Sequence, residues 1–152
     1  MKINRFIHEK RKELSMTQEQ MAACLGVSAP AVHKWEKGAT YPDITLLPAL
    51  ARLLKTDVNT LLSFQEDLTD IEIESFVNEV DKTAQEQGYE TAFQMALDKI
   101  HEYPTCDNLL YQVSFYLEGA LFLYGVPQQK RYKDVLEEFY LRLSKSETGE
   151  IR

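Results

Sequence analysis

The sequence predicts an all-α protein with two helical domains, and three observations carry this prediction. Apolar residues recur every three or four positions along most of the 152-residue chain, which is the spacing of one helix face. Thr, Ser or Asp often precedes such a stretch, and Gly or Pro often ends it. Residues 1–62 hold nine Lys/Arg and six Asp/Glu (+3), whereas the remainder holds eight and eighteen (−10). This asymmetry favours two domains that face different partners.

The first predicted helix covers residues 3–14, with Ile3, Phe6, Ile7 and Leu14 on one face. Three basic residues lie near its C-terminus, where positive charge stabilises a helix.

A short second helix is predicted for TQEQMAACLG, residues 17–26. Thr17 and Gln20 have the spacing of a capping box, and Gly26 can supply the left-handed residue that ends the helix. The face predicted to be buried holds Met21, Ala22 and Leu25.

A third helix is predicted for residues 28–37. Ser28 can cap it, Pro30 stands in its first turn, where no amide hydrogen bond is lost, and Gly38 ends it. We expect Val32 and Trp35 to face inward. We expect the opposite side to expose Ala29, Pro30, His33, Lys34 and Lys37.

A fourth helix, capped by Asp43, is predicted for residues 44–55, and a fifth, capped by Asp57, for residues 58–62. The second and third helices, joined by a short turn with Gly, have the form of a helix-turn-helix unit. The exposed side of the third helix can then approach base edges, with Lys34 donating to guanine or phosphate. An ordinary amphipathic helix with exposed lysines would show the same periodicity.

The segment TQEQMAACLGVSAPAVHKWEKGATYPDITLLPALARLLKTDVNTLL resembles the phage Cro/cI-repressor (XRE-like) class of helix-turn-helix regulators. The resemblance covers roughly residues 3–62 and includes Gly26 and the WE-x-G-x-x-YPD segment. It implies a five-helix, lambda-repressor-like DNA-binding domain whose third helix lies in the major groove. It further implies a sequence-specific transcriptional regulator, expected to be a repressor, that binds double-stranded DNA as a homodimer on an inverted repeat.

By matched position, Gln18 falls where the family contacts the DNA backbone. Phosphate and base contacts are implied for Ser28, Ala29, Pro30 and Lys34, and further backbone contacts for Lys37, Thr40 and Tyr41. Arg11 and Glu36 occupy positions that commonly form a buried, structural salt bridge.

Positions 29 and 30 depart from the family, which often has Gln, Arg or Thr there. Ala29 and Pro30 cannot read a base by two hydrogen bonds. Specificity would therefore rest on Lys34, His33, methyl contacts and DNA shape.

We expect the DNA-binding domain to cover residues 1–63, an acidic linker residues 64–70, and a helical domain for dimerisation or effector sensing residues 71–152. Short connections predict antiparallel neighbours in that domain, vaguely like tetratricopeptide hairpins. Its four predicted helices are 71–87, 89–103, 107–124 and 131–144. The third of them is apolar around much of its circumference, which indicates either a central core helix or half of an interface.

Other functions find little support. No catalytic motif and no metal-ligand spacing is present, so we expect neither an enzyme nor a cofactor. No apolar run approaches the ~20 residues of a membrane span, and no signal peptide is apparent, so a cytoplasmic location is expected. Cys24 and Cys106 are expected to be reduced core thiols. The ending ETGEIR (147–152) looks like the start of another helix, so we expect the natural chain to continue.

Two hypotheses of different classes therefore stay open. The first is the DNA-reading regulator, with a C-terminal region that dimerises or senses a peptide or small-molecule effector. The second is a protein- or peptide-interaction module whose helix-turn-helix domain binds DNA weakly or without sequence preference.

Overall fold

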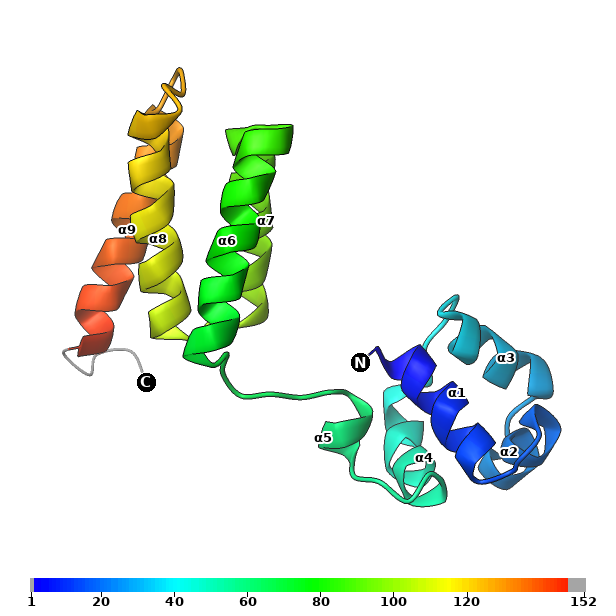
Figure 1. Ribbon diagram of the computed structural model, residues 1–152. Coiled ribbons are helices and arrows are strands. Elements are labelled where there is room, and N and C mark those ends of the chain that lie inside the picture. The colour runs from blue at the N-terminus through cyan, green and yellow to red at the C-terminus, as the bar shows by residue number, and fades with distance from the viewer. Residues whose placement is uncertain (1, 148–152) are drawn as a thin grey trace. The chain divides into compact units, whose positions relative to one another are not determined.

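The computed structural model describes residues 2–147, and its contacts divide the chain into two compact units, Met1–Gln65 and Glu66–Arg152 (Figure 1). Every regular element within residues 2–147 is a helix, which confirms the all-α prediction. None of the helices among these residues is long and apolar enough to cross a bilayer. The predicted extra helix at ETGEIR lies outside the described residues except for Glu147, the last residue of α9.

The first unit consists of short helices around one core. Its elements are α1 (Ile3–Glu13), α2 (Gln18–Leu25), α3 (Ala29–Lys37), the 3₁₀ turn η1 (Ile44–Leu46), α4 (Leu47–Leu53) and α5 (Val58–Leu61). Helix α3 packs against both α1 and α2, and α4 packs against α2 and α5. The core is formed by the buried residues Ile7, Met21, Ala22, Val32, Trp35, Leu47, Leu50, Ala51, Leu54 and Leu61.

The fourth helix starts later than the sequence predicts. Asp43 does cap a helical segment, accepting a hydrogen bond from the Thr45 amide (2.9 Å), but this segment is the 3₁₀ turn η1. The reason is Pro48, which has no amide hydrogen to donate to the Ile44 carbonyl, so that carbonyl accepts from Leu47 instead.

Cys24 is exposed on α2, so the prediction that it is a core thiol is wrong. Met21 and Ala22 point into the core and Leu25 is half-buried, which places Cys24 on the outer side of the same helix. Cys106, at the start of α8, is buried as predicted, and both cysteines are free thiols.

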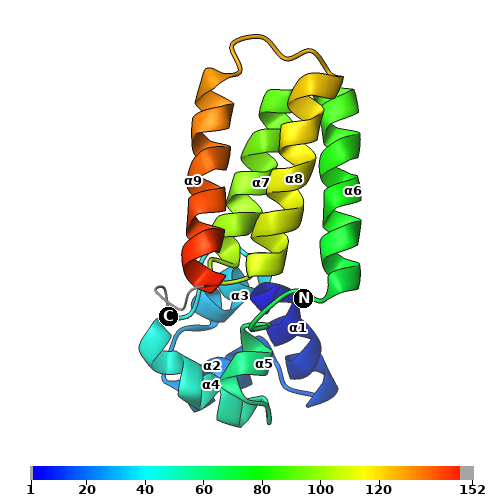
Figure 2. The same ribbon diagram turned by 90° about the vertical axis from the view of Figure 1, so that its left-hand side faces the viewer.

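The second unit is built from two helical hairpins. The first is α6 (Asp70–Gln87) with α7 (Tyr89–Glu102), and the second is α8 (Asp107–Leu123) with α9 (Lys130–Glu147). Helix α8 packs against α6, α7 and α9, and in Figure 2 it lies in front of α7. The Tyr89 hydroxyl on α7 donates to the Leu117 carbonyl on α8 (2.9 Å), which satisfies both groups inside the core.

Candidate nucleic-acid interface

The turn between α2 and α3 is set by local hydrogen bonds. Thr17 Oγ1 accepts from the Gln20 amide (3.1 Å), and Gln20 Oε1 accepts from the Thr17 amide (2.8 Å), so α2 begins with a full capping box. Gly26 ends α2 at φ 69°, in the left-handed region that favours glycine. Ser28 Oγ then accepts from the Ala31 amide (3.3 Å) and starts α3. Sequence alone therefore fixes where both helices of the pair begin.

The two faces of α3 differ sharply. Val32 is fully buried and Trp35 is 6% exposed, so these two side chains anchor the helix to the core. The outer side presents the exposed residues Pro30, His33, Lys34 and Lys37.

Ala29 is half-buried and packs against the core, so the prediction that it is exposed is wrong. It lies one helical turn before Val32 and therefore shares the inward edge of α3. This leaves Pro30 as the exposed apolar residue at the start of the helix.

Glu36 holds the end of α3 to the neighbouring helices. Its carboxylate accepts from Arg11 Nε (2.5 Å), Arg11 Nη2 (3.0 Å) and Gln18 Nε2 (2.9 Å), and it contacts His8 Nδ1 at 2.9 Å. Burial would raise the pKa of Glu36, but the hydrogen bonds from Arg11, His8 and Gln18 outweigh it and lower the pKa to about 2. Arg11 Nη1 also donates to the Met16 carbonyl (2.8 Å). This cluster fixes α3 in place at both α1 and α2.

The cluster gives Gln18 and His8 roles that sequence reasoning missed. The Gln18 side chain is half-buried and hydrogen-bonded to Glu36, so its backbone amide, at the start of α2, is the group suited to a phosphate. His8 stands 28 residues before Glu36, and no local pattern could pair the two.

Cations near α3 fall into paired and unpaired groups. On α1, Arg5 pairs with Glu9 (2.9 Å) and Lys10 with Glu13 (2.7 Å). Within residues 2–147, neither Lys34 nor Lys37 takes part in an ion pair, so both remain available to an anionic partner.

Two hollows flank the C-terminal half of α3. The first, about 370 Å³, is lined by His8, Gln18, His33, Glu36 and Lys37. The second, about 420 Å³, is lined by Lys2, Ile3, Asn4, Lys37, Gly38 and Tyr41. Tyr41 is 74% exposed and Thr40 is exposed beside it, so both lie on the surface next to the end of α3. The second hollow adds Lys2 and Asn4, which sequence reasoning did not single out.

Comparison with known proteins identifies this architecture. A helix-turn-helix family model matches residues 7–61, which run from the middle of α1 to the end of α5. The chain is 36% identical over 62 residues to an uncharacterised HTH-type transcriptional regulator of Methanothermobacter thermautotrophicus, covering 90% of that protein and 40% of this chain. The chain belongs to the helix-turn-helix family of transcriptional regulators. The resemblance to XRE-like regulators is thereby confirmed, and a domain of this family implies DNA binding.

Two further proteins are similar to this regulator. It is 35% identical over 78 residues to the HTH-type transcriptional activator BcrR of Enterococcus faecalis, and this match covers 51% of the regulator and 38% of BcrR. A solved structure of Bacillus thuringiensis PlcR in complex with the peptide PapR7 and DNA matches 99% of the regulator and 51% of the PlcR chain, at 19% identity and a TM-score of 0.42. The regulator thus spans less than two thirds of the length of either protein.

Proposed function

We propose that this regulator binds double-stranded DNA in a sequence-dependent way, with α3 in the major groove. The observation that carries the proposal is the division of α3 into a buried face, Val32 and Trp35, and a face that presents Pro30, His33, Lys34 and Lys37. A helix held in this manner has the geometry of a recognition helix. The ion-pair cluster at Glu36 supports it further, because a fixed helix loses little conformational freedom on binding.

Base reading is assigned to His33 and Lys34, which are exposed on adjacent positions of α3. Lys34 can donate to N7 and O6 of guanine, and Pro30 can contact a thymine methyl group. Phosphate contacts are assigned to the surrounding groups, which position the helix without reading sequence. These are the backbone amides near Gln18 and Ser28, the N-terminal end of α3 at Ala29, the Lys37 ammonium, and the Thr40–Tyr41 segment.

The regulator is further proposed to act as a homodimer on an inverted repeat, since a two-fold dimer presents two recognition helices about one DNA turn apart. Repression is the expected outcome. The similar protein BcrR is named a transcriptional activator. A reporter assay at the selected promoters therefore decides whether this regulator represses or activates transcription.

Selection of genomic fragments with the purified full chain, at roughly physiological salt, tests the proposal. The expected result is enrichment of a two-fold-symmetric motif. Binding that falls steeply with salt and prefers no sequence would contradict it and favour the interaction-module alternative.

A further inference from the structure

A hollow lies between the turns of the two hairpins in the second unit. On the α6–α7 side it is lined by Gly88 and Glu90. On the α8–α9 side it is lined by Val126, Pro127 and Arg131. Both turns lie at the same end of this unit (Figure 1), and the hollow has a volume of about 630 Å³. Because sites for small molecules usually measure about 300–1,000 Å³, one small ligand can fit here.

Two buried tyrosines line the hollow and give it a rigid surface. Tyr89 and Tyr132 are 7% and 6% exposed. Their rings meet edge to face with centroids 4.9 Å apart, and the Tyr132 ring also meets the Phe93 ring edge to face at 4.8 Å. A surface packed in this way changes little when a ligand binds, so little conformational freedom is lost.

The α8–α9 turn is also held in place. The Tyr124 hydroxyl donates to Asp81 Oδ1 on α6 (2.9 Å), which ties the end of α8 to the first hairpin. Gln129 Nε2 donates to the Leu121 carbonyl (3.1 Å), which ties the turn back to α8. Both sides of the hollow are therefore formed before any ligand arrives.

An ion pair with open binding positions lines the hollow. Arg131 Nη2 contacts Glu90 Oε2, and the Tyr132 hydroxyl accepts from Arg131 Nη2 (2.7 Å) and donates to Glu90 Oε2. Within residues 2–147, Glu90 Oε1 and the Nε and Nη1 atoms of Arg131 make no further hydrogen bond. One carboxylate oxygen and two guanidinium nitrogens thus remain available to a ligand.

The signs of these charges select the ligand. A lone anion would meet the Glu90 carboxylate and a lone cation would meet the Arg131 guanidinium, so each would be repelled by one member of the pair. A zwitterion instead places its ammonium group against Glu90 Oε1 and its carboxylate against Arg131 Nε and Nη1. Because the two side chains contact each other, the two charges of the ligand must also lie close together.

An α-amino acid meets this requirement, because its ammonium and carboxylate groups are attached to the same carbon. The ends of an extended tripeptide lie about 10 Å apart, so the terminal charges of a peptide are too far from each other. The rest of the lining includes Ala84, Val126, Pro127 and the ring of Tyr124, which suit an apolar side chain.

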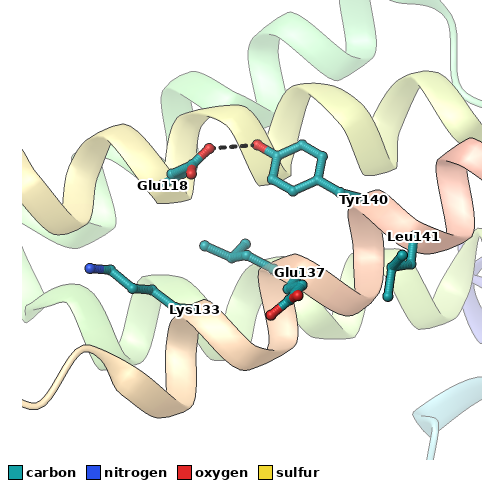
Figure 3. Close-up of a pocket in the computed structure, with 6 residues that line it drawn as sticks. Glu118, Lys133, Glu137, Tyr140 and Leu141 are labelled. Atoms are coloured by element: carbon teal, nitrogen blue, oxygen red, sulfur yellow. Dashed lines mark hydrogen bonds between the residues drawn. The ribbon is translucent and has the colours of Figure 1, made fainter.

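A second hollow of this unit lacks such a pair of charges. It lies between α8 and α9 (Figure 3), has a volume of about 440 Å³, and is lined by the charged residues Glu118, Lys133 and Glu137. Glu118 accepts a hydrogen bond from the Tyr140 hydroxyl on α9 (2.9 Å). Among residues 2–147, none of the three charged groups forms an ion pair. Lys133 therefore offers a control for Arg131, since it is a cation beside a hollow without a paired carboxylate.

We propose that the hollow between the hairpin turns binds a free α-amino acid with an apolar side chain. The amino acid bridges the two hairpins, since Glu90 belongs to α7 and Arg131 to α9. It thereby acts as a small-molecule effector that stabilises the second unit. The proposal goes beyond DNA binding, and its test needs no DNA, so either proposal can fail while the other stands.

Amide NMR of the isotope-labelled full chain tests the proposal, with L-leucine as the probe and a reducing agent present because Cys24 is exposed. L-leucine should shift the signals of Gly88, Glu90, Val126 and Arg131 saturably, with a Kd of about 1 mM or lower. Isocaproate lacks the ammonium group of leucine and isoamylamine lacks its carboxylate, so both should bind much more weakly. The tripeptide leucyl-glycyl-leucine should also bind more weakly, because its two charges are far apart.

Two substitutions remove one charge each. Arg131→Gln and Glu90→Gln should each raise the Kd for L-leucine roughly tenfold or more, because each loses a charge-assisted hydrogen bond. Both side chains are mostly exposed, and glutamine keeps an oxygen that can accept from the Tyr132 hydroxyl, so helical circular dichroism should stay unchanged. The matched controls are Lys133→Gln, beside the second hollow, and Glu86→Gln, exposed on α6, and neither should change the Kd.

The absence of a saturable shift with L-leucine would overturn the proposal. Isocaproate, isoamylamine or the tripeptide binding as tightly as L-leucine would overturn it too, because the paired charges would then not select the ligand. Shifts centred on the second hollow, or controls that weaken binding as much as Arg131→Gln and Glu90→Gln, would place the ligand elsewhere.

Discussion

Replacing Glu36 by Gln gives the sharpest test of how α3 is held. The change keeps the shape of the side chain but removes the negative charge that faces Arg11. Both side chains are almost fully buried, at 4% and 7% exposure. The Arg11 guanidinium would then keep its hydrogen bond to the Met16 carbonyl but lose its only ion-pair partner within residues 2–147. We expect the first unit to become less stable, because a buried charge without a counter-charge is costly.

The magnitude follows from the Glu36 pKa. A fall from the ordinary 4.5 to about 2 corresponds to roughly 3 kcal/mol in favour of the folded carboxylate at pH 7, which solvent screening reduces to about 2–3 kcal/mol. Because the folded pKa is below the unfolded one, this stability is fully present above about pH 5 and is lost as the pH falls towards 2. At pH 3, less than half of the difference between wild type and Glu36→Gln should remain.

Urea unfolding followed by tryptophan fluorescence measures this effect, since Trp35 is the chain's only tryptophan and is buried in the first unit. Glu9→Gln serves as the control: it breaks the exposed Arg5–Glu9 pair and should cost no more than about 0.5 kcal/mol. A loss at Glu36→Gln as small as that of the control, or a loss that is the same at pH 7 and pH 3, would refute the reasoning.

Three further predictions address the interface and the two cores. Lys37→Ala should weaken binding to all DNA sequences about equally and reduce the slope of log affinity against log salt concentration by roughly one. Fluorescence anisotropy measures both effects, with Lys82→Ala as the control. A change in sequence preference would contradict the phosphate role of Lys37. Gly26→Ala and Gly38→Ala should each cost about 1–2 kcal/mol, because φ is 69° and 72° at these positions. Gly38→Ala should lower the free energy of unfolding by more than Gly26→Ala, because its Cβ would lie 3.3 Å from Asn4 Nδ2. Combining it with Asn4→Ala should remove this difference in the Trp35 fluorescence assay. Equal losses at Gly26 and Gly38 would count against the contact. Leu117→Ala should lower the free energy of unfolding of the second unit by about 2–5 kcal/mol, as followed by circular dichroism. Leu123→Ala, at a site 72% exposed, should lower it little. Equal losses would be inconsistent with the described core.

Local chemistry explains what the sequence could predict. Thr17, Gly26, Ser28 and Gly38 act through hydrogen bonds or backbone angles within a few residues, so helix ends could be placed from residue type alone. The family resemblance supplied the Arg11–Glu36 pair, whose two residues lie 25 positions apart.

The features that the sequence did not predict depend on tertiary packing, except for one local competition between leucine spacing and a proline. The His8 and Gln18 contacts with Glu36 depend on how α1, α2 and α3 meet, which no single helix pattern reveals. Ala29 is half-buried because it lies at the border of the buried face of α3, and Cys24 is exposed because Met21 and Ala22 turn the other side of α2 into the core. The local conflict is at η1, where the leucine spacing predicts α-helix but Pro48 has no amide hydrogen to continue it.

The central claim is that the exposed side of α3 reads DNA sequence, and the most direct measurement compares the motifs selected from random DNA by the wild type and by Lys34→Ala. Lys34 is exposed and makes no ion pair within residues 2–147, so its removal should leave the fold unchanged. The account predicts that the variant loses preference at one base position in each half-site, symmetrically about the centre, with affinity for the preferred site reduced by about 1–3 kcal/mol. An unchanged motif, bound with unchanged affinity, would show that α3 does not read the sequence through Lys34 and would contradict the account.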